Sequence, residues 1–151
     1  MKLQDFKFRI YDTKEKCYLS EDELVPALFS KKNRYEVELL SNLKTTYGTN
    51  SYLYDKDIVQ IDLHKGDNIT RIIAEVIYTD EREWYMRFYS NENTIMSPLE
   101  TFNINKDFIK DYDKVILYMY GNSHDAGVQD KIKNDTKISF EKLNRILLNT
   151  F

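Results

Sequence analysis

The chain contains very little cysteine, proline or glycine: its 151 residues include one Cys, two Pro and four Gly. Because Cys17 has no second cysteine to pair with, the chain cannot form an internal disulfide, and its cysteine content gives no indication of an oxidising compartment. The scarcity of glycine and proline excludes collagen-like repeats and low-complexity linkers. We therefore expect ordered structure over most of the chain.

Long apolar runs and a strong charge imbalance are also missing. No apolar segment approaches the roughly 20 residues needed to cross a bilayer, and the first residues contain no apolar signal-peptide core. The 22 basic and 25 acidic residues leave a net charge of −3, which is too balanced for a protein that binds nucleic acid through charge alone. We expect a cytoplasmic protein without membrane contact.

Most of the secondary-structure patterns in the sequence are those of β-strands. Hydrophobic residues make up 42% of the chain and aromatic residues 14%, enough for one domain core. In the central stretch, Val59, Ile61 and Leu63 alternate with polar residues, the period-2 pattern of a strand with one buried face. Comparable patterns predict further strands at residues 6–11, 17–19, 35–40, 69–78, 83–89 and 115–120. The main core is expected to contain Val59, Ile61, Ile72, Val76, Trp84, Met86, Phe88, Leu117 and Met119.

Helical signals are fewer. Ser20 and Glu23 form a capping box ahead of an apolar helical pattern that contains Leu24, Ala27 and Leu28, interrupted by Pro26. Residues 97–100, Ser-Pro-Leu-Glu, have the cap and first-turn proline typical of a short helix. A further helical turn is predicted around Phe108, Ile109 and Tyr112. Residues 43–51 are predicted as a loop, and residues 125–135 form a polar, charged segment to which no helix or strand is assigned.

The C-terminal segment has a clear amphipathic pattern. After Ser139 as N-cap, Phe140, Leu143, Ile146 and Leu147 share one face of a predicted helix. An isolated helix of this length is marginal in water, so it must dock. It packs either on its own domain or on a neighbouring subunit, in which case these four residues form a self-association surface.

We predict an α+β fold dominated by β-structure: a small antiparallel, SH3-like barrel core with short helices and a C-terminal helix. Residues 1–125 form the β-rich domain, and residues 126–151 form the polar segment and the helix.

Three short motifs resemble, in the same order, those of YopX-type proteins, which occur in phages and prophages of low-GC Gram-positive bacteria. Phe6–Asp12 resembles their Lys-Phe-Arg-Ala-Trp-Asp start, Leu53–Val59 their Ile-Tyr-Glu-Gly-Asp-Ile-Val, and Val115–Asn122 their Val-Ile-Gly-Asn-Ile-Tyr-Glu-Asn. Lys56 takes the place of the family's usual glycine. The resemblance implies a phage- or prophage-encoded accessory protein in a bacterial host cell, with no assigned activity and no catalytic residues to carry over.

Two carboxylates in the central motif are candidates for chemistry. Asp55 and Asp57 lie two residues apart, as paired catalytic carboxylates of a hydrolase would. Acidic residues beside a tight turn more often accept hydrogen bonds from backbone N–H groups, and we favour that structural role.

The two histidines have acidic neighbours in the sequence. Asp62 and Asp67 lie near His64, and Asp125 follows His124, but neither group has a recognised metal-ligand spacing. There is no glycine-rich phosphate loop either. We therefore expect no metal, no other cofactor and no enzymatic activity.

Tyrosine and arginine residues on neighbouring strands are a candidate interaction surface. Tyr85, Arg87 and Tyr89 project from the face opposite Trp84, with Arg71 on an adjoining strand. Such aromatic and basic strips bind single-stranded nucleic acid, but the same residues also suit sheet packing and protein interfaces. We expect a non-enzymatic binding module that acts on protein, either itself as a homo-oligomer or a host or phage protein. Nucleic acid is the alternative partner.

Overall fold

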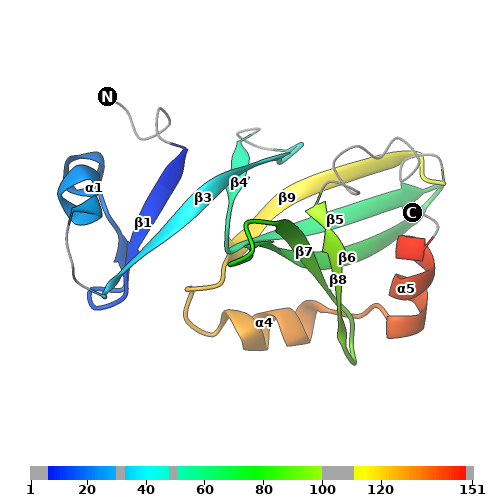
Figure 1. Ribbon diagram of the computed structural model, residues 1–151. Helices are drawn as coiled ribbons and strands as arrows, with labels where there is room; N and C mark the ends of the chain where they lie inside the picture. Colours follow the sequence, from blue (N-terminus) through cyan, green and yellow to red (C-terminus); the bar gives the residue numbers. More distant parts are fainter. Residues whose placement is uncertain (1–6, 30–32, 48–50, 100–110, 149–151) are drawn as a thin grey trace.

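The computed structural model describes residues 7–29, 33–47, 51–99 and 111–148, which form two antiparallel sheets (Figure 1). The strands are β1 (Phe8–Asp12), β2 (Cys17–Tyr18), β3 (Tyr35–Lys44), β4 (Tyr52–Tyr54), β5 (Asp57–Lys65), β6 (Asn68–Tyr78), β7 (Trp84–Tyr89), β8 (Thr94–Pro98) and β9 (Lys114–Asn122). The labelled helices are α1 (Glu21–Leu28), α4 (Val128–Asp135) and α5 (Phe140–Leu148).

The strand order is β2-β1-β3-β4 in the smaller sheet and β8-β7-β6-β5-β9 in the larger one. The larger sheet curls into a half-barrel, so the predicted β-dominated α+β fold is confirmed. In Figure 1 the long strand β3 runs from the N-terminal unit at the left, which carries α1, towards the half-barrel at the right. Among the described residues, no helix is long and apolar enough to cross a membrane.

The main core lies on one face of the larger sheet. Ile61 pairs with Ile72 on one side and Leu117 on the other, so their side chains share that face. The predicted core residues that are buried here are Val59, Ile61, Ile72, Val76, Met86, Phe88 and Leu117. Trp84 is only partly buried against them. The placement of Met119 in the core is wrong: this residue is 51% exposed, because β9 is an edge strand with a neighbour on one side only.

The C-terminal helix docks on its own chain. Leu143 and Leu147 of α5 are buried in the main core, Ile146 packs against it, and Phe140 is half-buried. Of the two predicted arrangements, the structure therefore has the intramolecular one, and the apolar face of α5 is covered by the half-barrel.

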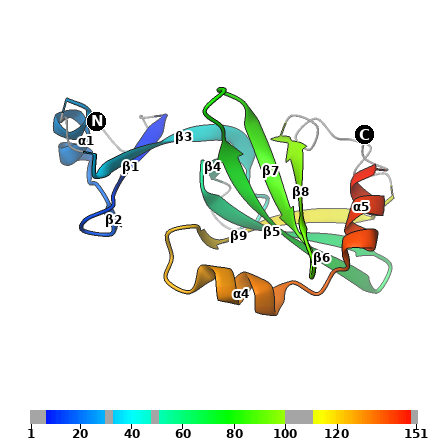
Figure 2. The ribbon, with the colours of Figure 1, turned by 60° about the horizontal axis from the view of Figure 1, so that its bottom comes forward.

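A second helix covers the opposite face of the larger sheet. Val128 and Ile132 of α4 are buried against Ile58 and Ile73, which alternate with the main-core residues of β5 and β6 (Figure 2). Most of the polar segment 125–135, to which the sequence pattern assigned no helix, is therefore helical. The segment has only these two apolar residues at helical spacing, too weak a pattern to outweigh its polar composition.

Two further local predictions are correct only in part. Residues 43–51 are not all loop, because β3 continues to Lys44. Ser97 and Pro98 end strand β8, since Ser97 pairs with Met86 of β7, and the helical conformation predicted for residues 97–100 begins only at Leu99. Pro98 is tolerated because β8 is an edge strand. Phe6, Phe108 and Ile109 lie outside the described residues.

The predicted helix after Ser20 is confirmed as α1. The Glu23 carboxylate accepts hydrogen bonds from the backbone N–H of Ser20 at 3.0 Å and from its hydroxyl at 2.8 Å. Leu24 and Ala27 are buried against the smaller sheet. Leu28, the third apolar residue of the predicted pattern, is 48% exposed.

We expect Leu143→Ala to lower the free energy of unfolding by about 2–5 kcal/mol, because it leaves a cavity in the main core. The matched control is Leu148→Ala at an exposed position of the same helix, which should change stability by less than about 0.5 kcal/mol. Chemical denaturation measures both, and light scattering should show an unchanged mass. Equal effects of the two substitutions would contradict the docking of α5.

Candidate functional site at the junction of the two sheets

A cluster of polar side chains lies where the two sheets join. It draws on the three segments that resemble the YopX-type motifs: Arg9 comes from β1, Asp57 from the start of β5, and Asn122 and His124 from the end of β9. Glu38 of β3 completes it. His124 and Glu38, which are in direct contact, are 86 residues apart in the sequence.

The alternation of the strands explains why these residues meet. Arg9 pairs with Glu38 and Tyr11 with Glu36 across β1 and β3, so all four side chains share one face of the smaller sheet. Ile10 lies between them in sequence and points to the other face, where it packs under α1. One face of the small sheet is therefore apolar and covered by the helix, and the other is polar and turned to the junction.

Arg9 connects the smaller sheet to the larger one. Its Nε donates a hydrogen bond to Glu38 Oε1 at 2.8 Å, and its Nη2 donates to Asp57 Oδ1 at 2.9 Å. The guanidinium also lies over the rings of Tyr18 and Tyr54. Although burial opposes it, the neighbouring Asp57, Tyr18 and Glu38 raise the pKa of Arg9, so the group is a permanent cation.

Glu38 is the buried centre of the cluster, with a side chain that is 0% exposed. Its Oε1 accepts hydrogen bonds from Arg9 and from the Tyr18 hydroxyl at 2.8 Å. Burial raises the pKa of Tyr18 and the bond to Glu38 acts in the same direction, outweighing Arg9, so the phenol remains a donor. The other oxygen, Oε2, accepts a hydrogen bond from His124 Nε2 at 2.7 Å.

His124 forms the outer part of the cluster. Its ring stacks on Tyr11 with 3.6 Å between centroids, and its backbone N–H donates to Asn122 Oδ1 at 2.9 Å. Glu36 Oε2 lies 3.7 Å from His124 Nε2 and accepts from Lys56 Nζ at 2.8 Å. Because Glu36 and Lys56 are partly exposed, the cluster runs from a buried carboxylate to a solvent-accessible rim.

The turn between β4 and β5 uses both candidate catalytic carboxylates for structure. Asp55 Oδ1 accepts a hydrogen bond from Tyr78 N–H at 2.9 Å, and Asp57 Oδ2 accepts one from Tyr54 N–H at 2.8 Å, as predicted for acidic residues at such a turn. Burial raises the pKa of Asp55 despite the bond from Tyr78. Between them, Lys56 has φ = 75°, in the left-handed region that favours glycine.

Two carboxylates that sequence reasoning did not consider lie beside His124. The oxygen atoms of Glu36 and Glu38 and a ring nitrogen of His124 all lie within 4.8 Å of one another, close enough to hold a metal ion. Spacing along the chain could not reveal this group, because β3 and His124 are far apart in sequence. The available signal was the i, i+2 pair of glutamates in a predicted strand, which places both on one face.

The acidic neighbours of the histidines have other roles. Asp125 Oδ2 accepts the backbone N–H of Asn122 at 2.8 Å. Asp62, near His64, forms an ion pair with Arg71. Neither carboxylate lies with its neighbouring histidine in the one group of metal-ligand type found among the described residues.

The four residues of the predicted tyrosine and arginine strip have different surroundings in the structure. Arg71, Tyr85, Arg87 and Tyr89 share the face of the larger sheet on which α4 packs. Tyr89 packs against the cluster beneath α4, and its hydroxyl donates to Glu75. Arg71 donates to both oxygens of Asp62, at 3.0 and 3.2 Å. The four residues therefore share a face, but helix packing and an ion pair engage two of them.

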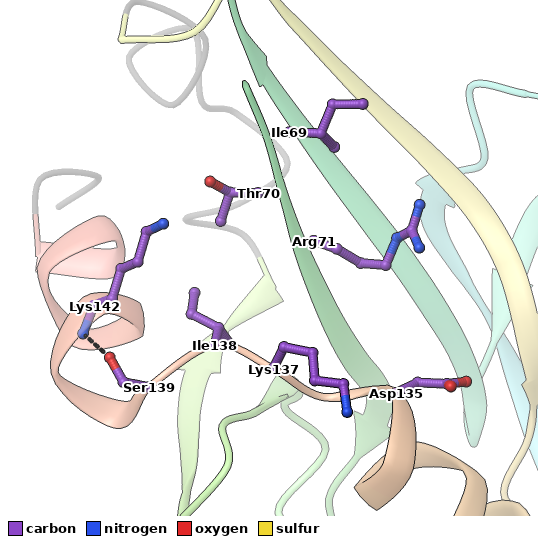
Figure 3. Close-up of a pocket in the computed structure, with 8 residues that line it drawn as sticks. All are labelled: Ile69, Thr70, Arg71, Asp135, Lys137, Ile138, Ser139 and Lys142. Atoms are coloured by element: carbon purple, nitrogen blue, oxygen red, sulfur yellow. Dashed lines mark hydrogen bonds between the residues drawn. The ribbon is translucent and has the colours of Figure 1, made fainter. Parts of the chain in front are cut away.

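A groove of about 600 Å³ lies between β6 and the segment that joins α4 to α5 (Figure 3). Its lining includes three basic side chains, Arg71, Lys137 and Lys142, and one acidic side chain, Asp135. The Tyr120 hydroxyl donates to Asp135 at 2.7 Å. The groove is thus cationic on balance and open to solvent.

We expect Lys56→Gly to preserve or raise stability. A left-handed backbone at a non-glycine residue costs about 1–2 kcal/mol, whereas the partly exposed ion pair with Glu36 contributes at most about 1 kcal/mol. Lys56→Ala is the control, since it loses the ion pair but keeps the strain. In chemical denaturation the glycine variant should be the more stable of the two, and the reverse order would contradict this account.

Comparisons of the chain with protein-family models, with curated proteins and with solved structures found no match. The side chains and their geometry therefore carry the functional argument.

Proposed function

We propose that the chain is a non-enzymatic accessory protein, encoded by a phage or prophage, that binds a protein partner through the outer face of α1. One observation carries the proposal: Phe29, directly after α1, is 83% exposed, and Val25 and Leu28 are about half exposed. Spacings of three and four residues place these side chains on one face of the helix. Large apolar side chains gathered on an exposed surface are typical of interaction sites.

The helix that presents this surface is held firmly. Its opposite face buries Leu24 and Ala27 against Ile10 and Leu19, and its N-terminus is capped. Val37, which pairs with Ile10 and is 50% exposed, adds apolar surface on the same side of the smaller sheet. A partner would therefore meet a preformed surface and lose little conformational entropy of this chain on binding.

The charged residues of α1 indicate which kind of partner protein would complement this surface. The first turn of α1 contains Glu21, Asp22 and Glu23, and its last turn contains no basic residue. A partner with apolar side chains next to Lys or Arg complements this surface. A second copy docked through the same helix would offer another acidic first turn and no basic residue in the last turn to complement it. We therefore infer a different protein, from the host or the phage, in the cytoplasm of a bacterial host cell.

The two candidate catalytic carboxylates already form hydrogen bonds within the protein, which supports a non-enzymatic role. Asp55 and Asp57 are each bonded to backbone N–H groups, and Asp57 is also paired with Arg9. A carboxylate held in this way is poorly placed to exchange protons with a substrate.

The test is affinity capture from lysate of the bacterial host, with and without nuclease. We expect one protein to be captured by the wild type and by Met96→Asp, a control on β8 whose 45% exposure is close to that of Leu28. Leu28→Asp and Phe29→Asp should each weaken capture at least tenfold, because interface anchors typically contribute more than about 1.4 kcal/mol. A photo-crosslinking residue at position 29 should form an adduct with the same protein.

Equal capture by the wild type and by both α1 variants would overturn the proposal. A concentration-dependent dimer that Leu28→Asp abolishes, measured by light scattering, would identify a second copy as the partner instead.

A second candidate, single-stranded nucleic acid, is favoured by the groove alone. Arg71, Lys137 and Lys142 could follow a phosphate backbone. None of the described residues that line it has an aromatic side chain on which a base could stack, and Arg71 is already paired with Asp62. Salt-dependent oligonucleotide binding that Lys137→Ala weakens, together with capture that nuclease abolishes, would favour this candidate over the first.

A further inference from the structure

We propose that Glu36, Glu38 and His124 form a binding site for a divalent transition-metal ion of the Zn²⁺ type, independent of the surface on α1. Their ligand atoms lie within 4.8 Å of one another, and His124 Nε2 is 2.7 Å from Glu38 Oε2 and 3.7 Å from Glu36 Oε2. One imidazole nitrogen and two carboxylate oxygens are a donor set that such ions bind in proteins.

The surroundings orient each ligand. Arg9 and Tyr18 occupy Glu38 Oε1, so that Oε2 is directed to His124. The stacked Tyr11 ring and the bond to Asn122 fix the position of the imidazole. Outer contacts of this kind are what metal sites use to hold their ligands. The buried part of the site is therefore organised before any ion binds.

The charge balance of the junction is a separate argument. Three carboxylates, of Glu36, Glu38 and Asp57, gather around two permanently charged basic side chains, those of Arg9 and Lys56, and the imidazole of His124. Buried charge is normally paired or bound to a metal. A divalent cation held by Glu36, Glu38 and His124 would add positive charge beside the fully buried Glu38 side chain.

Binding requires only small changes. Ligand atoms about 2.0–2.2 Å from a tetrahedral ion lie roughly 3.3 Å apart, so His124 and Glu38 must separate by about half an ångström. The Nε2 proton passes to solvent, and Glu36 exchanges its bond to Lys56 for the ion. Because Glu36 and Lys56 are partly exposed, the remaining coordination position faces water. Lys56 and the metal therefore compete for the same carboxylate.

The experiment is calorimetric titration of Zn²⁺ into tag-free, chelator-treated protein, with Co²⁺ absorption as a report of coordination geometry. We expect one ion per chain and a melting temperature that rises with the metal concentration. Glu36→Gln and His124→Gln should each weaken binding at least a hundredfold, and His64→Gln, at the other histidine, should leave it unchanged. Glu36 is partly exposed, so its variant keeps the fold.

The variant Lys56→Ala best distinguishes a specific metal site from adventitious metal binding. A metal site predicts that removing the competing ammonium tightens Zn²⁺ binding several-fold, whereas adventitious binding to surface histidine predicts no change. The proposal is overturned if Zn²⁺ binds with no defined stoichiometry, if Glu36→Gln binds as tightly as the wild type, or if Lys56→Ala leaves binding unchanged or weakens it.

Discussion

The buried guanidinium of Arg9 is the contact on which the rest of the structure depends. It is held between Glu38 of the smaller sheet and Asp57 of the larger one, and it also donates to the Asp55 carbonyl at 3.2 Å. Removing one partner of such a buried pair leaves an uncompensated charge, which typically costs about 3–5 kcal/mol. The part of the smaller sheet beneath α1 meets the half-barrel at this polar junction, and its apolar cluster is separate from the main core. The other end of the sheet reaches the main core through Leu43 of β3 and Leu53 of β4.

Strand β3 contributes to both the proposed protein-binding surface and the proposed metal site, because its two faces carry different residues. Val37 lies on the side of α1 and its exposed apolar face, whereas Glu36 and Glu38 lie on the side of His124. The junction therefore fixes the position of the helix surface and also supplies the ligands of the proposed metal site. Ion binding at Glu36 and Glu38 would stiffen the same strand that supports the proposed protein contact.

Much of the larger sheet could be predicted from sequence, because residues such as Val59, Ile61 and Leu63 alternate strictly along β5. The pattern misplaced the start of a helix where tertiary pairing decided the structure, since Ser97 pairs with β7 as a strand residue and helical conformation begins only at Leu99. It also missed α4, whose buried side has only two apolar residues, Val128 and Ile132. The metal-ligand group could not be predicted, because His124 meets Glu38 only through the join of the two sheets. The exposure of Leu28 could not be predicted either, because the sequence pattern does not distinguish Leu28 from the buried Leu24.

The most direct test of the central role of Arg9 is a double-mutant cycle with Arg9→Met and Asp57→Asn. The free energy of unfolding is measured for the wild type, both single variants and the double variant. Because the two side chains are paired across the sheets at 2.9 Å, we predict a coupling energy of about 1–3 kcal/mol. Hydrogen exchange should show the lost protection concentrated in β1 and β3. Additive effects within about 0.5 kcal/mol would contradict the account, because the two sheets would then be joined independently of this ion pair.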